Sequence, residues 1–428
     1  MHFLKFNKFF YPFLVASTTV LIGIGIWQKF FTTDALPVIK NRSSIKLSEV
    51  ALPPPHSLFI NLLCDESINK EFKSSCSVDT HIGDTKENFS NVLIKLKGKK
   101  SEPQIGYGLY FEDKVNLFDI ESSKTWRLTP LFRDLSFLRE KLSNDLFQLL
   151  NPKLKIPKLN FIEVFINGNY NGLYLLHRKL TRKALGIKKK SQWNKKGIIF
   201  KAKSGNRDEL LSSADKDLLM SQFQQVYPDL YRYHFDRMDY LLSVREGVKA
   251  LSENDPEKIL SLFNLDNYFS YYLFSLLSGN KFNASFYLFY VPRESISYII
   301  QNNNSKSFGI SHHREMHYIN DIDAHPLYLN IDKNPLYWKM LQVKWKEIEE
   351  DQQILDFLNK KVDHYTKLIS DSADRDFAHW QKPRISDATR TIHTNWKREI
   401  EYLKTWIERR TVFLNSYFSE NEPRHISK

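Results

Sequence analysis

The strongest constraint on the fold is a pair of apolar runs joined by a short turn of asparagine and glycine. Residues 161–166 and 172–177 consist mostly of aromatic and aliphatic side chains, a composition that favours strands. Between them lies Asn167-Gly168-Asn169-Tyr170-Asn171. Because Asn and Gly tolerate positive φ, this segment predicts a β-hairpin.

The hairpin lies inside a longer region whose pattern predicts mainly strands, residues 58–205. Residues 91–98 alternate in part between apolar and polar side chains and end in a glycine, which is typical of a strand followed by a turn. We expect one helix in this region, at residues 136–150.

Residues 206–418 are predicted to be mainly helical. Asp266 is expected to cap a helix that is rich in aromatic residues and ends at Leu277. Residues 338–369 and 387–418 repeat apolar side chains at helical spacing. Residues 419–428 are polar and predict a flexible tail. The sequence therefore predicts an α+β protein with a strand-rich first lobe and a helical second lobe.

A hydrophobic segment near the N-terminus predicts a membrane anchor. Residues 9–28 contain no charged side chain, and twenty helical residues span about 30 Å, the thickness of a bilayer core. No signal-peptidase pattern of small residues follows, which favours an uncleaved anchor. A buried core helix is the alternative, which the polar segment after it disfavours.

The charges beside this segment predict its orientation. Residues 1–8 are basic and are expected to stay in the cytoplasm, although basic residues also follow the span. Residues 29–57, with three consecutive prolines near their end, predict a stalk. We expect a single-pass membrane protein whose C-terminal domain lies outside the cytoplasm, in a bacterial periplasm or at the cell surface.

The net charge of +13 favours an anionic partner. No helix-turn-helix, zinc-finger or RRM pattern is present, so a nucleic acid is not expected. The expected partners are the membrane, through residues 9–28, and an envelope protein or acidic polymer. The densest basic run, residues 188–196, is the candidate contact, with a solvated loop as the alternative.

Cys64 and Cys76 are the two cysteines of the chain. They are too few for a disulfide scaffold. An oxidising compartment would allow one disulfide between them, and two free thiols are the alternative.

Several motifs together resemble the spore coat protein H (CotH) kinase family. The most specific is the hairpin, and it is preceded by a D-x-S-x-x-R motif at a helix start. The resemblance runs in order from about residue 92 to residue 418. The matching segments are residues 126–128, 134–139, 161–176, 286–290, 334–338 and 406–414.

The resemblance implies an atypical, trimmed protein-kinase-like fold with two lobes. It also implies an enzyme that uses ATP and a divalent metal, Mg²⁺ or Mn²⁺, to phosphorylate secreted proteins. Phosphoryl transfer of this kind requires a Lys for the phosphates, a Glu that orients the Lys, and Asp residues for the hydroxyl and the metal.

The positions that match these roles carry other residues in this chain. The phosphate-binding Lys is replaced by an apolar residue, the orienting Glu by an Arg, and the Asp positions by neutral or basic residues. Amides and hydroxyls bind Mg²⁺ less well than carboxylates do. The replaced positions are Ile105, Arg178, Asn280, Lys281, Asn303 and Ser305.

Two further groups of side chains are candidate sites. The first, for an anionic ligand, contains Lys97, Lys99, Lys100, Ser101 and Asn303. The second is a histidine- and aspartate-containing segment that suits a transition metal, with a polar loop as the alternative. It contains His313, His317, Asp321 and Asp323.

The sequence therefore predicts a pseudokinase with a binding or scaffolding role in the cell envelope and no required cofactor. The alternative is an active kinase in which other residues have taken over the catalytic roles, and that enzyme would need ATP and a divalent metal.

Overall fold

The computed structural model describes twelve parts of the chain, all of them after residue 57. They are residues 58–98, 103–182, 185, 187, 197–202, 223–228, 261–279, 286–291, 296–302, 305–310, 334–380 and 395–419. The predicted anchor and stalk, residues 9–57, lie outside them. Within these parts, no helix is long and apolar enough to cross a membrane.

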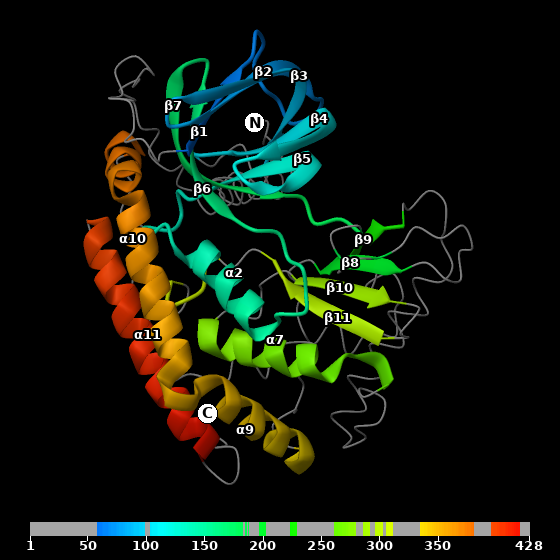
Figure 1. The fold of residues 1–428 in the computed structure, drawn as a ribbon, viewed down its shortest axis with the longest axis vertical. Helices are drawn as coiled ribbons and strands as arrows, with labels where there is room; N and C mark the ends of the chain where they lie inside the picture. The colour runs from blue at the N-terminus through cyan, green and yellow to red at the C-terminus, as the bar shows by residue number, and fades with distance from the viewer. Residues whose placement is uncertain are drawn as a thin grey trace, which may run out of the picture. The chain divides into compact units, whose positions relative to one another are not determined.

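Seven strands form a closed barrel in the order β1-β2-β3-β4-β5-β7-β6 (Figure 1). The β1 and β6 strands close it with parallel pairing, and the other neighbours are antiparallel. The strands are β1 (Leu58–Leu63), β2 (Ser74–Ile82), β3 (Thr85–Lys97), β4 (Gly106–Leu117), β5 (Ile120–Pro130), β6 (Asn160–Ile166) and β7 (Asn169–Arg178).

Alternation along these strands separates the inside of the barrel from its outer wall. Ile94, Leu109, Trp126 and Leu176 belong to the apolar cluster that fills the interior. Their neighbours in sequence point outward, and this places Lys95, Gly108, Arg127 and His177 in one row of the outer wall.

The predicted hairpin is confirmed as β6 and β7. Asn167 and Gly168 form the turn with φ of 50° and 77°. Gly172, with φ of 114°, lies at an irregularity of the β6–β7 pairing. The Cys64 and Cys76 sulfurs are bonded to each other, which joins the end of β1 to β2.

A second, four-stranded antiparallel sheet follows in the order β11-β10-β8-β9. Its strands are β8 (Ile198–Ala202), β9 (Phe223–Tyr227), β10 (Phe286–Val291) and β11 (Ile296–Gln301). Three of these strands lie in the region predicted to be helical, so the second lobe is mixed rather than purely helical. Short aromatic and β-branched runs such as Phe286–Val291 favour strands because they pack on one buried face.

The helices are α2 (Arg139–Leu150), α7 (Leu265–Ser278), α9 (Pro335–Glu349), α10 (Gln353–Trp380) and α11 (Trp396–Ser419), with a short 3₁₀ helix, η3 (Glu350–Gln352), before α10. Their buried faces form the larger apolar cluster together with Phe161 and Leu175 of the outer barrel wall. Figure 1 shows α10 and α11 running side by side.

Three details of the helices differ from the prediction. The α2 helix begins at Arg139 because the residues before it form a hydrogen-bonded turn on Asp134. Asn264, not Asp266, caps α7, since its side chain accepts a hydrogen bond from the Asn267 backbone N–H. The predicted helix 338–369 is interrupted by η3, where Gln352 has a φ of 61°.

Helix α10 is tied to the barrel by two polar contacts. The Arg375 guanidinium donates to both carboxylate oxygens of Glu163 on β6, at 2.9 and 2.7 Å. The Asp376 Oδ2 atom accepts from the Leu173 backbone N–H at 2.7 Å. Because Glu163 and Asp376 are both buried, these bonds set the position of the helix on the hairpin.

Candidate functional site

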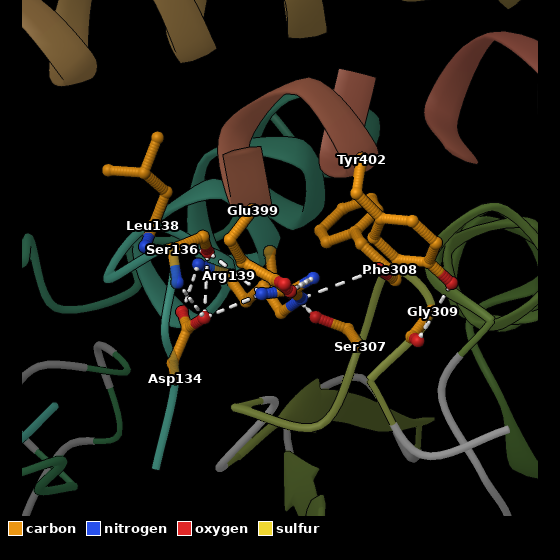
Figure 2. A network of polar contacts seen from close by, with 10 residues as sticks. Asp134, Ser136, Leu138, Arg139, Ser307, Phe308, Gly309, Glu399 and Tyr402 are labelled. Carbon is orange, nitrogen blue, oxygen red and sulfur yellow. Dashed lines mark hydrogen bonds and ion pairs between the residues drawn. The ribbon is translucent and has the colours of Figure 1, made fainter. Parts of the chain in front are cut away.

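The D-x-S-x-x-R motif forms a buried polar turn at the start of α2 (Figure 2). The Asp134 Oδ1 atom accepts from the Ser136 backbone N–H at 2.9 Å and from the Ser136 hydroxyl at 2.7 Å. The Asp134 Oδ2 atom accepts from the Arg139 backbone N–H at 2.8 Å. The motif therefore satisfies the free N–H groups of the helix start, as a cap does.

The Arg139 side chain extends this network to two other parts of the chain. It donates to Asp134 at 2.7 Å, to Glu399 of α11 at 2.7 Å, and to the Phe308 carbonyl at 3.3 Å. Arg139 and Glu399 are both 0% exposed. Burial by itself lowers the pKa of Arg139, but the charges of Asp134 and Glu399 outweigh it and raise the pKa.

This network holds the turn 305–310, which contains Ser305, one of the replaced positions of the resemblance. The Ser307 hydroxyl lies 2.7 Å from that of Ser143, and the Tyr402 hydroxyl donates to the Gly309 carbonyl at 3.2 Å (Figure 2). The Phe308 backbone N–H donates to the Ser278 carbonyl at 2.7 Å. The turn is thus firmly positioned. Ser305, within it, stands where the resemblance expects an aspartate.

The position expected for the phosphate-binding Lys is part of the barrel framework. The Ile105 carbonyl accepts from the Tyr174 hydroxyl at 2.9 Å. Its neighbour Gln104 is 1% exposed, accepts from the Phe132 backbone N–H, and donates to the carbonyls of Asn171 and Leu173. Gln104 therefore has a structural role, and Ile105 has no charged group to offer a phosphate.

The position expected for the orienting Glu is Arg178, at the end of β7. Its guanidinium pairs with the exposed Glu121 at 3.0 Å. Alternation along β7 puts Arg178 on the same side as Tyr174 and on the opposite side from His177. A cation in this place cannot orient a lysine, since like charges repel.

Several positive side chains lie on or near the outer wall of the barrel, next to this strand end. Lys97 of β3 and Arg127 of β5 approach each other over Gly108. The charge of Arg127 also acts on Lys179, which follows β7, and on Lys201 of β8. Burial, followed by the charge of Arg127, lowers the pKa of both Lys179 and Lys201. We call Lys97, Arg127, Lys179 and Lys201 the cationic group.

A tyrosine and a histidine lie among these cations. Arg127 donates to the Tyr110 hydroxyl at 3.4 Å. Burial would raise the pKa of Tyr110, but hydrogen bonds and charges from Arg127 and Lys97 lower it to about 8. Burial, with a smaller effect of Arg127, lowers the pKa of His177 to about 4, so this ring is neutral at pH 7.

A comparison with protein families decides the relationship of the chain. A model of the CotH kinase protein family matches residues 94–414, well over half of the 428 residues. The chain belongs to the CotH kinase family. A search of curated proteins found no significant match.

The structure describes only part of the predicted site of this CotH-family protein. Lys97, Ile105, Arg178 and Ser305 are described, and Lys97 joins the cationic group. No set of three or more His, Cys, Asp or Glu side chains that could hold a metal occurs within the described ranges. The other predicted residues lie outside these ranges: Lys99, Lys100, Ser101, Asn280, Lys281, Asn303, His313, His317, Asp321 and Asp323.

Sequence reasoning missed Arg127, Lys179 and Lys201. No short motif connects them, because β5 pairs with β7 in the barrel while β8 belongs to the second sheet. Alternation along β5 and β7 could have placed Arg127 and Lys179 on the outward side, but it could not have shown that Lys201 lies near them.

Proposed function

We propose that this CotH-family chain is a membrane-anchored pseudokinase that acts by binding, outside the cytoplasm, in the cell envelope. The observation that carries the proposal is the chemistry of the described kinase positions. Ile105 is apolar, Arg178 is a cation paired with Glu121, and Ser305 is a neutral hydroxyl. These three groups do not fit a metal-bound ATP, which needs a Lys, a Glu and metal-binding carboxylates there.

The retained framework agrees with a binding role. The Asp134–Arg139–Glu399 network keeps α2, α11 and the turn 305–310 in place. It does so although Ser305 replaces an expected aspartate in that turn. A fold kept without its catalytic groups is consistent with a scaffold, since fold alone does not determine activity.

One feature supports the membrane anchor, and another supports the location outside the cytoplasm. Residues 9–28 are uncharged and long enough to span a bilayer. The bond between Cys64 and Cys76 fits an oxidising compartment outside the cytoplasm.

The decisive experiment is a phosphate-transfer assay on the full-length chain in neutral detergent. With radiolabelled ATP and Mg²⁺ or Mn²⁺, we expect no metal-dependent label on the chain or on generic protein acceptors. The heat-denatured chain is the control for non-specific label. The double variant Asn303→Asp, Ser305→Asp is expected to regain Mn²⁺ binding without turnover, because catalytic groups that act as a unit are not additive.

Robust metal-dependent autophosphorylation would overturn the pseudokinase proposal in favour of an active kinase. Lys99, Lys100, Asp321 and Asp323 would then be the first replacements to test, each by substitution with Ala.

A further inference from the structure

The cationic group brings positive side chains from the barrel and from the second sheet near Arg127. Among the described residues, none of Lys97, Arg127, Lys179 and Lys201 forms an ion pair. By contrast, Lys124, on the same strand as Arg127, pairs with Asp113. Like charges placed close together repel, so the arrangement favours an anionic occupant.

Gly108, which has no side chain, leaves room on the outer wall for the side chains of Arg127 and Lys97. A Cβ atom at Gly108 would lie 2.1 Å from the Arg127 Nη1 atom and 3.1 Å from the Lys97 Cε atom. Gly108 is opposite Arg127 in the β4–β5 pairing. Its missing side chain therefore lets the Arg127 and Lys97 charges lie next to each other.

The second sheet supplies the fourth charge. Lys201 of β8 is paired with Tyr287 of β10, and its ammonium lies 5.9 Å from the centre of that ring. Arg127 is close enough to influence both residues electrostatically. The charge of Arg127, on the barrel, thus acts on Lys201 of the second sheet.

We propose that the cationic group binds a ligand with two or more linked phosphate groups, without a divalent metal. This inference rests on the proposed function, because it names the ligand class of the pseudokinase. An Arg fork matches phosphate oxygens in pairs, and lysines add point charges. In kinases a metal neutralises the phosphates; here protein cations on several strands do so.

The test is isothermal titration of the full-length chain with inorganic tripolyphosphate in the presence of EDTA. We expect saturable one-to-one binding that weakens as the salt concentration rises, because salt screens partly exposed charges. Adding Mg²⁺ in place of EDTA should not strengthen it. ATP is titrated in parallel to separate the two sources of linked phosphates: tighter binding of ATP identifies a nucleotide, and equal or weaker binding identifies an inorganic oligophosphate.

Three variants assign the binding to the cationic group. Arg127→Gln is expected to weaken binding at least tenfold, and Lys201→Gln severalfold. Gly108→Ala is expected to weaken binding by displacing Arg127 while it removes no charge. Lys124→Gln is the matched control, with the same loss of charge on the same strand, and is expected to bind as the unmodified chain does.

Absence of binding in EDTA, or an equal loss in Lys124→Gln, would overturn this inference. Neither result would restore phosphate transfer, so the pseudokinase proposal would stand. Conversely, an active phosphate-transfer assay together with EDTA-insensitive binding would remove the pseudokinase proposal and leave the phosphate site in place.

Discussion

At the scale of single residues, the charge of Arg139 is central to a buried ion network. It is buried and shared between Asp134 and Glu399, which are also buried. Removing one partner of a buried ion pair leaves a charge without compensation, which costs about 3–5 kcal/mol.

We therefore expect Arg139→Met to lower the free energy of unfolding by about 3–5 kcal/mol in urea denaturation. Lys404→Met is the control, because the Lys404–Asp363 pair is exposed and such pairs contribute about 0–1 kcal/mol. Similar losses in the two variants would contradict a structural role for the motif.

The Tyr110 phenol should titrate near pH 8, below its usual pKa of 10. Lys73, which lies 4.0 Å from the centre of the Tyr110 ring, Lys97, Arg127 and Lys179 are the charged groups around it. Ultraviolet difference spectra of the native chain should show one phenolate forming near pH 8, which Tyr110→Phe removes.

The same shift predicts how stability depends on pH. Between pH 8 and 10 the unfolded chain binds more protons at Tyr110 than the folded chain, so folding becomes more favourable as pH rises. Denaturation across this range should show the native chain gaining stability relative to Tyr110→Phe. The absence of any difference would mean that the cations do not act on the phenol.

At the scale of the secondary-structure elements, the junction of the β6–β7 hairpin with α10 depends on Gly172. Its φ of 114° strains other residues, and a Cβ there would lie 2.3 Å from the Gln104 Nε2 atom and 2.7 Å from the Asp376 Oδ2 atom. A side chain at this position would therefore separate α10 from the hairpin.

We expect Gly172→Ala to destabilise the chain by about 3 kcal/mol or more, since backbone strain of about 1–3 kcal/mol adds to the clash. Gly168→Ala is the matched control: its φ is also positive, at 77°, but no atom lies within 4 Å of the added Cβ. Urea denaturation of the two variants separates strain from clash, and equal losses would show that the close approach is unimportant.

At the scale of the whole molecule, the proposed topology puts the barrel and the helices outside the cytoplasm. A reporter enzyme that works only outside the cytoplasm, fused after Lys428, should be active, and a matched reporter that works only inside should be inactive. Mass spectrometry of the unreduced chain should find a peptide linked through Cys64 and Cys76. Activity of the inside reporter, or two alkylatable thiols in the native chain, would contradict this topology.

The sequence by itself determined the features that depend on neighbours along the chain. The β6–β7 hairpin followed from the Asn-Gly turn, and the family followed from motifs in a fixed order. Tertiary structure decided the rest. The Asp134 motif is a buried ion network only because α11 brings Glu399 to it. The cationic group exists only because β5 pairs with β7 in the barrel and Lys201 of the second sheet lies within electrostatic range of Arg127. Charge interactions act over distance in space, and a linear pattern does not record such distances.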